Sequence, residues 1–174
     1  MQWLFDTYVA IRDFMELGGP VLYVIAMVIL WMWVLILERI IYFRTAHHLH
    51  VSAESAVWLG RQERTSWHAA QVRAGMVSRI SVAAHGSIPM IKTMVALCPL
   101  LGLVGTVTGM IDVFDVLAIA GTGNARSMAA GVSKATIPTM AGMVGALSGV
   151  FAAALLSRVA AKAVKELDDV FVTD

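Results

Sequence analysis

The sequence predicts an all-α membrane protein with three transmembrane helices that extend into the cytoplasm. Of its 174 residues, 59% are hydrophobic and only 14% are charged, and the mean hydropathy is +0.76. Soluble domains carry closer to a quarter charged residues. Residues 93–111 and 135–157 contain no charge and are rich in Gly, Ala and Thr. Small residues at three- and four-residue spacing let membrane helices approach closely, so both stretches are predicted to lie inside a helical bundle.

The N-terminal part is predicted to form two elements. Residues 1–19 carry apolar side chains at helical spacing, which predicts a short amphipathic helix on the membrane surface. Residues 20–43 are predicted to be the first transmembrane span, because their apolar run is long enough to cross a hydrocarbon core of about 30 Å. Pro20 fits the first helical turn. Within this span, Glu38 is interpreted as an anchor beside Arg39.

The remaining elements follow from the same pattern. Residues 44–89 are predicted to form a cytoplasmic helical segment that continues from the membrane spans and is too small to be an enzyme domain. Residues 90–120 and 127–157 are the second and third predicted spans. The Gly-rich break after residue 120 makes 121–126 a tight turn, so these spans form an antiparallel hairpin. Residues 158–174 are the predicted cytoplasmic tail.

The distribution of basic residues predicts the orientation. Cytoplasmic segments of membrane proteins carry an excess of Lys and Arg. The segment between the first two spans and the tail are both rich in these residues, whereas the opposite side has few. The N-terminus is therefore predicted to lie outside. The basic residues on the cytoplasmic side are Arg44, Arg61, Arg64, Arg73, Arg79, Lys92, Arg158, Lys162 and Lys165, and those outside are Arg12 and Arg126.

The hairpin carries the main candidate site. Thr106 and Thr139 both fall near the middle of their spans, each on a stripe of small residues, and a hydroxyl there can offer a donor and an acceptor to a narrow pore. The alternative is that each hydroxyl bonds the carbonyl four residues earlier in its own helix. Six glycines are predicted to serve helix packing: Gly102, Gly105, Gly109, Gly142, Gly145 and Gly149.

Three charged residues are further candidates. Lys134 is the one charge in the third span before Arg158, and an ionisable residue at membrane depth is a functional candidate, although its stem could also snorkel to the interface. It lies about 140° around an ideal helix from Thr139, so both can line one pore only if Pro138 distorts the helix. Asp112 and Asp115 could gather cations at a pore mouth or be solvated interface carboxylates.

Several other classes of function find little support. The formal net charge of +1 argues against nucleic-acid binding. The single Cys98 excludes an internal disulfide, and His47, His48, His50 and His68 match no metal-ligand spacing. No nucleophile–base pair, phosphate loop or dinucleotide fingerprint is present. We therefore expect no enzyme activity, no metal and no cofactor.

Two runs of residues resemble a known family. CPLLGLVGTVTGMIDVF at residues 98–114 is similar to the second-span pattern of the MotA/TolQ/ExbB proton-channel family. MAAGVSKATIPTMAGMVGALSG at residues 128–149 resembles its third span, and ERIIYFR at 38–44 loosely resembles its first. The three-span topology with the N-terminus outside also matches, and the resemblance is strongest to the ExbB branch in a compact form.

The resemblance implies an ExbB-like subunit of the bacterial inner membrane. Such subunits form a homopentamer around a central pore, which receives membrane helices of an ExbD-like partner bearing an essential Asp, and proton flow energises a TonB-like protein for outer-membrane transport. Thr106 and Thr139 occupy the family's pore-facing positions. Lys134 stands where ExbB proteins carry Glu, so it could pair with the partner's Asp. A TolQ-like role in envelope integrity and division, and a non-conducting membrane scaffold, are the alternatives.

Overall fold

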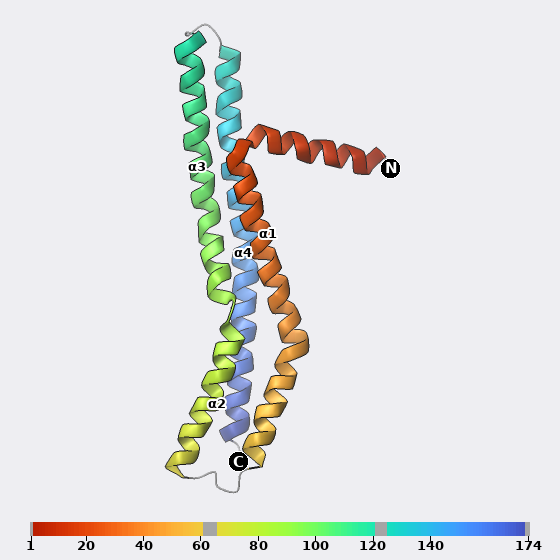
Figure 1. Ribbon diagram of the computed structural model, residues 1–174, viewed down its shortest axis with the longest axis vertical. Helices are drawn as coiled ribbons and strands as arrows, with labels where there is room; N and C mark the ends of the chain where they lie inside the picture. The colour runs from red at the N-terminus through yellow and green to blue at the C-terminus, as the bar shows by residue number, and fades with distance from the viewer. Residues whose placement is uncertain (1, 61–65, 121–124, 173–174) are drawn as a thin grey trace. The chain divides into compact units, whose positions relative to one another are not determined.

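The computed structural model describes residues 2–60, 66–120 and 125–172, and it describes side chains for all of these except 2, 46–59, 69, 120, 125–127 and 167–172. The described chain is helical throughout: α1 (Gln2–Leu59), α2 (Trp67–His85), α3 (Ile88–Ala120) and α4 (Ala125–Val172) (Figure 1). Three stretches are long and apolar enough to cross a membrane, namely Trp3–Thr45, Ala70–Ile119 and Met128–Glu166. The predicted all-α fold with three membrane-spanning helices is confirmed at this level.

The helices divide into two compact units. Unit 1 comprises Met1–Met32 and Thr93–Val150, and unit 2 comprises Trp33–Lys92 and Phe151–Asp174. The predicted 121–126 turn lies largely outside the described residues, although α4 already begins at Ala125. The segment predicted as a tail is helical, because α4 continues to Val172.

In unit 1, α1 is kinked at Gly19, where φ is 67° and ψ is −168°. A positive φ of this size is strained for residues with a Cβ, so Gly is needed here. Pro20 then starts the next helical stretch, where its missing N–H is not needed. Figure 1 shows the N-terminal helix turning away from the rest of α1 at this point. The kink separates an N-terminal helix with exposed Trp3 and Phe14 from the first apolar span.

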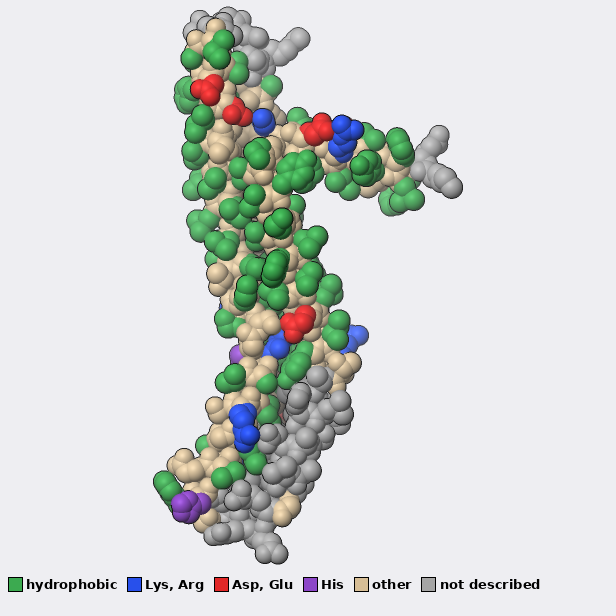
Figure 2. Space-filling model, in the orientation of Figure 1, with side chains coloured by type: hydrophobic (Ala, Val, Ile, Leu, Met, Phe, Trp, Pro, Cys, Tyr) green, Lys and Arg blue, Asp and Glu red, His purple; other side chains and the backbone are tan. Residues whose placement is uncertain are grey.

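The core of unit 1 lies where α1, α3 and α4 meet. It contains Leu22, Ile25 and Met32 of α1, Cys98 and Val113 of α3, and Ala135, Pro138 and Ala146 of α4. The outward faces of α3 and α4 are apolar as well, which suits contact with lipid or with other membrane helices. Figure 2 shows hydrophobic side chains spread over the visible face of this hairpin. Exposed members include Leu100, Leu103, Val107, Met143, Val144 and Leu147.

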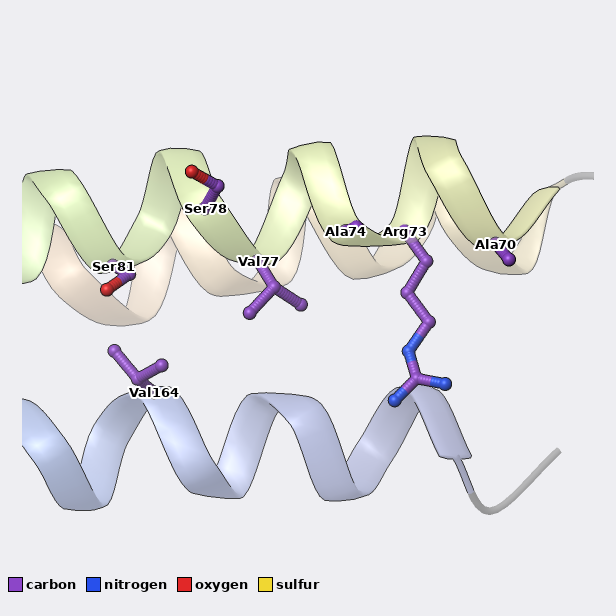
Figure 3. A pocket seen from close by; sticks show the side chains of 7 residues that line it. All are labelled: Ala70, Arg73, Ala74, Val77, Ser78, Ser81 and Val164. Carbon is purple, nitrogen blue, oxygen red and sulfur yellow. The ribbon is translucent and has the colours of Figure 1, made fainter. Parts of the chain in front are cut away.

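Unit 2 packs α2 against parts of α1 and α4. Its buried side chains are Ile36 and Arg39 of α1, Met76, Ile80 and Ala84 of α2, Ile88 and Ile91 of α3, and Ala153, Leu156 and Ala160 of α4. An open groove of about 490 Å³ runs between α2 and α4, and Figure 3 shows the Arg73 side chain reaching across it, with the side chains of Val77 and Val164 pointing into it.

Candidate functional site

The site is built on the contact between α3 and α4, where small residues bring the two backbones together. A Cβ atom placed on Gly102 would lie 2.9 Å from the Cα of Thr139, and one on Gly109 would lie 2.5 Å from the Cβ of Ala135. A Cβ on Gly142 would lie 2.5 Å from the carbonyl oxygen of Cys98. Side chains larger than hydrogen do not fit at these distances, so glycine permits this close approach.

The other three glycines named above meet side chains rather than backbone. Gly105 faces the ring of Pro138 on α4. Gly145 faces Ile29 of α1, and Gly149 faces Met32 of α1 together with Val95 of α3. All six glycines are buried. The first apolar span of α1 therefore packs against α3 and α4 at these glycines.

The two threonines differ in their hydrogen bonds. The Thr139 hydroxyl donates across the hairpin to the carbonyl oxygen of Gly102 at 3.2 Å. The Thr106 hydroxyl donates to the carbonyl oxygen of Leu103, three residues earlier in its own helix, at 2.7 Å. The Thr106 bond resembles the alternative stated above, a hydrogen bond within the same helix, except that the acceptor is three rather than four residues earlier. The Thr139 bond does not, because its acceptor lies on the other helix. A hydroxyl has one donor and two acceptor lone pairs, so each oxygen can still accept.

Thr139 lies in an apolar groove on the outer side of the hairpin. The groove has a volume of about 580 Å³ and is lined by Pro99, Leu103, Thr139, Met143, Val144, Ala146, Leu147 and Val150. Among the described side chains, Thr139 supplies the polar group of this lining and Thr106 is not part of it. The groove could therefore bind an apolar helix and offer it the Thr139 hydroxyl oxygen as a hydrogen-bond acceptor.

Lys134 has a partner within the hairpin. Its ammonium donates to a carboxylate oxygen of Asp112 at 3.1 Å, and the two side chains are 41% and 56% exposed, respectively. The stem of Lys134 reaches the α1 kink, because a Cβ on Gly19 would lie 3.5 Å from its Cε. Asp112 and Lys134 share a cavity of about 130 Å³ with Gly18, Gly19 and Pro20. The pair combines two opposite charges that would each be costly in a membrane.

This pairing was missed by sequence reasoning, which treated Lys134 and Asp112 as separate candidates. A signal for it was present. Asp112 lies nine residues before Gly121, and Lys134 lies eight residues after Arg126, which are the two ends of the predicted turn. In an antiparallel hairpin, equal distances from the turn place two residues at equal depth. Asp115, one turn further along α3, is exposed.

Pro138 lies inside α4, which continues as one helix through it. It packs on Gly105. The described residues contain no group of three or more His, Cys, Asp or Glu that could hold a metal, and the side chains of His47, His48 and His50 lie outside the described set. The candidate site therefore consists of the Thr139 groove, Thr106, and the Asp112–Lys134 pair.

Comparison with known proteins identifies the family of this chain. The pattern of the MotA/TolQ/ExbB proton channel family matches residues 46–169. The chain is also 48% identical over 61 residues to a biopolymer transport protein described as ExbB-like 1 from Synechocystis sp., an alignment that covers 33% of this chain and 24% of that protein. The chain thus spans about a quarter of the length of the relative it matches. Because the family match covers most of the sequence, including all of α3 and α4 up to residue 169, this chain belongs to the MotA/TolQ/ExbB proton channel family.

Proposed function

We propose that this chain is an ExbB-like subunit that uses the proton motive force to energise TonB-dependent outer-membrane transport. The observation that carries the proposal is Thr139, a half-buried hydroxyl in an otherwise apolar groove of the α3 and α4 hairpin. Membership of a proton channel family and the ExbB-like name of the matched relative favour this branch. In the proposed topology the N-terminus is periplasmic, the chain lies in a bacterial inner membrane, and segments 44–89 and 158–174 are cytoplasmic.

The hairpin needs an acid from another chain to conduct protons. Residues 93–111 and 135–157 contain no carboxylate, and threonine hydroxyls do not titrate at physiological pH. Both candidate hydroxyls donate to backbone carbonyls, so the lone pairs they present accept hydrogen bonds from water or from a protonated carboxyl group. We therefore propose a homopentamer whose pore receives an ExbD-like membrane helix bearing an Asp, with a TonB-like protein as the recipient of the motion.

The Asp112–Lys134 pair bears on how this partner is bound. Because Asp112 already accepts from Lys134, the lysine is compensated within the chain and does not depend on the partner's Asp. We propose that the pair lies towards the periplasmic mouth of the path, with Asp115 beside it. Each proton that crosses a 100 mV potential releases about 2.3 kcal/mol, so several protons are needed for a substantial rearrangement.

The decisive experiment compares three threonine variants, each expressed in a bacterial strain from which the gene for this chain has been deleted. Thr139→Val and Thr106→Val are expected to abolish TonB-dependent uptake of an iron complex while the subunits remain assembled in the membrane. The matched control is Thr136→Val, because the exposed Thr136 hydroxyl also donates to a carbonyl three residues earlier, at 2.9 Å, and lies outside the proposed path. Full uptake with Thr139→Val would refute the assignment of the groove.

The same strains separate the alternatives. Loss of detergent resistance in the deletion strain, with uptake intact, would indicate a TolQ-like role in envelope integrity and division. Unchanged uptake and unchanged detergent resistance in all three variants would indicate a non-conducting scaffold. Mass measurement of the complex in lipid nanodiscs tests the pentamer, and a monomer would contradict the shared pore.

A further inference from the structure

The break between α2 and α3 is contacted by two adjacent, oppositely charged residues of α1. Helix α2 ends at His85 and α3 begins at Ile88, so Gly86 and Ser87 form the break. An ending helix leaves its last carbonyls unpaired, and a beginning helix leaves its first N–H groups unpaired. These ends carry partial negative and partial positive charge, respectively. A break of this kind is stabilised by a cation at the first end and an anion at the second.

Arg39 supplies the cation. Its guanidinium donates from Nη2 to the carbonyl oxygen of Ala83, one of the last carbonyls of α2. A Cβ placed on Gly86 would lie 3.5 Å from both Nη atoms, so the guanidinium also touches the break itself. Arg39 is only 4% exposed and lies over the rings of Tyr42 and Phe43, 4.6 and 5.4 Å from their centroids. These contacts hold the guanidinium in one place.

Glu38 supplies the anion. Its carboxylate accepts a hydrogen bond from the hydroxyl of Ser87 at 2.9 Å. Ser87 directly precedes α3, and its carbonyl oxygen accepts from the N–H of Ile91 at 3.1 Å, which closes the first turn of the helix. The negative charge therefore stands at the positive end of α3.

We propose that Glu38 and Arg39 form a charge-matched clamp that stabilises the end of α2 and the first turn of α3 on the two sides of the break. Adjacent residues on a helix point about 100° apart, so one dipeptide reaches both sides of the break. Without the two contacts, the end of α2 and the first turn of α3 would open more often, because their unpaired carbonyl and N–H groups would lose the matching charges. The clamp is a conformational device of unit 2 and does not depend on the function proposed above.

Hydrogen–deuterium exchange of the full-length chain in lipid nanodiscs tests the clamp. The reporter is the Ile91 amide, in the first turn of α3. The Ala70 amide is a matched internal control, because it donates to the carbonyl of Ser66 at the same 3.1 Å in the first turn of α2, at the other end of that helix. Global stability is not the readout, because replacing a buried charge by an apolar side chain can leave it unchanged.

Arg39→Met is expected to raise the exchange rate of the Ile91 amide at least tenfold, and Glu38→Gln, which removes only an exposed charge at a helix end, about two- to fivefold. The Ala70 amide should change less than twofold in both variants. The reversed pair, Glu38→Arg with Arg39→Glu, keeps the composition but places each charge at the wrong helix end, so it should raise the rate further. Arg39→Lys keeps the positive charge but lacks the planar guanidinium, so its exchange rate at the Ile91 amide should lie between those of the native chain and Arg39→Met. Gly75→Ala, at a position with no atom within 4 Å of the added Cβ, should change neither amide.

Two results would overturn the proposal. The first is an unchanged rate at the Ile91 amide in Arg39→Met and Glu38→Gln. The second is a reversed pair that protects this amide as well as the native order does, because the match of charge to helix end would then be irrelevant. Glu38→Gln removes the negative charge of an exposed side chain and keeps an amide oxygen that can accept from Ser87, so it keeps the test open even if variants at the buried Arg39 fail to fold.

Discussion

The backbone contact between α3 and α4 can be tested by adding one methyl group. In Gly142→Ala the new Cβ would lie 2.5 Å from the carbonyl oxygen of Cys98 and 3.3 Å from the carbonyl carbon. Ordinary van der Waals contact begins at 3.4 Å, so the helices would have to move apart by about 0.9 Å at this point. The obstacle is backbone, which cannot turn away as a flexible side chain could.

The expected cost follows from two opposing effects. Adding a methyl group to a closely packed contact costs about 1–3 kcal/mol. Replacing Gly by Ala inside a helix stabilises the helix by about 1 kcal/mol, because Ala has the higher helix propensity. Gly142→Ala should therefore lower the free energy of unfolding by up to about 2 kcal/mol. Gly75→Ala in α2 is the matched control, because it gains the same propensity and its Cβ meets no atom within 4 Å.

The assay is reversible unfolding of the full-length chain in mixed micelles with increasing SDS, followed by helical circular dichroism. The difference in free energy of unfolding between the two variants isolates the packing cost, which should be about 1–3 kcal/mol. Gly75→Ala should be as stable as the native chain or more stable. If Gly142→Ala proved as stable as Gly75→Ala, the reasoning from backbone contact would be refuted.

Three further predictions use the same preparation. A double-mutant cycle with Lys134→Met and Asp112→Asn should give a coupling of about 0.2–1 kcal/mol in micelles, since both side chains are partly exposed, and zero coupling would mean that the pair does not form. Gly19→Ala should destabilise the chain by about 1–3 kcal/mol, because a φ of 67° with a ψ of −168° lies in a region that essentially only Gly adopts, and a gain in stability would contradict the kink. The thiol of Cys98 is fully buried, so a maleimide should label it at least tenfold more slowly in the native chain than in SDS. Labelling should also be faster in Gly142→Ala than in Gly75→Ala, and equal rates in these two variants would argue against separation of the helices.

Helix count and membrane character could be predicted because they depend on local properties. An apolar run of sufficient length makes a spanning helix wherever it stands in a bundle. The position of the kink can also be inferred from the sequence, because Gly18 and Gly19 provide conformational freedom and Pro20 is suited to a first helical turn. The GTVTGM run within the hairpin pointed to the family that the comparison then established.

Pairings between helices were beyond the reach of local patterns. Thr106 and Thr139 have the same residue type and similar depth, yet one hydroxyl bonds its own helix and the other crosses to α3. The partner of Arg39, the carbonyl oxygen of Ala83, is 44 residues away in the sequence. Which atoms meet depends on the register and rotation of packed helices. In the hairpin these are set by backbone contacts at Gly102, Gly109 and Gly142, because glycine permits close approach without specifying what approaches.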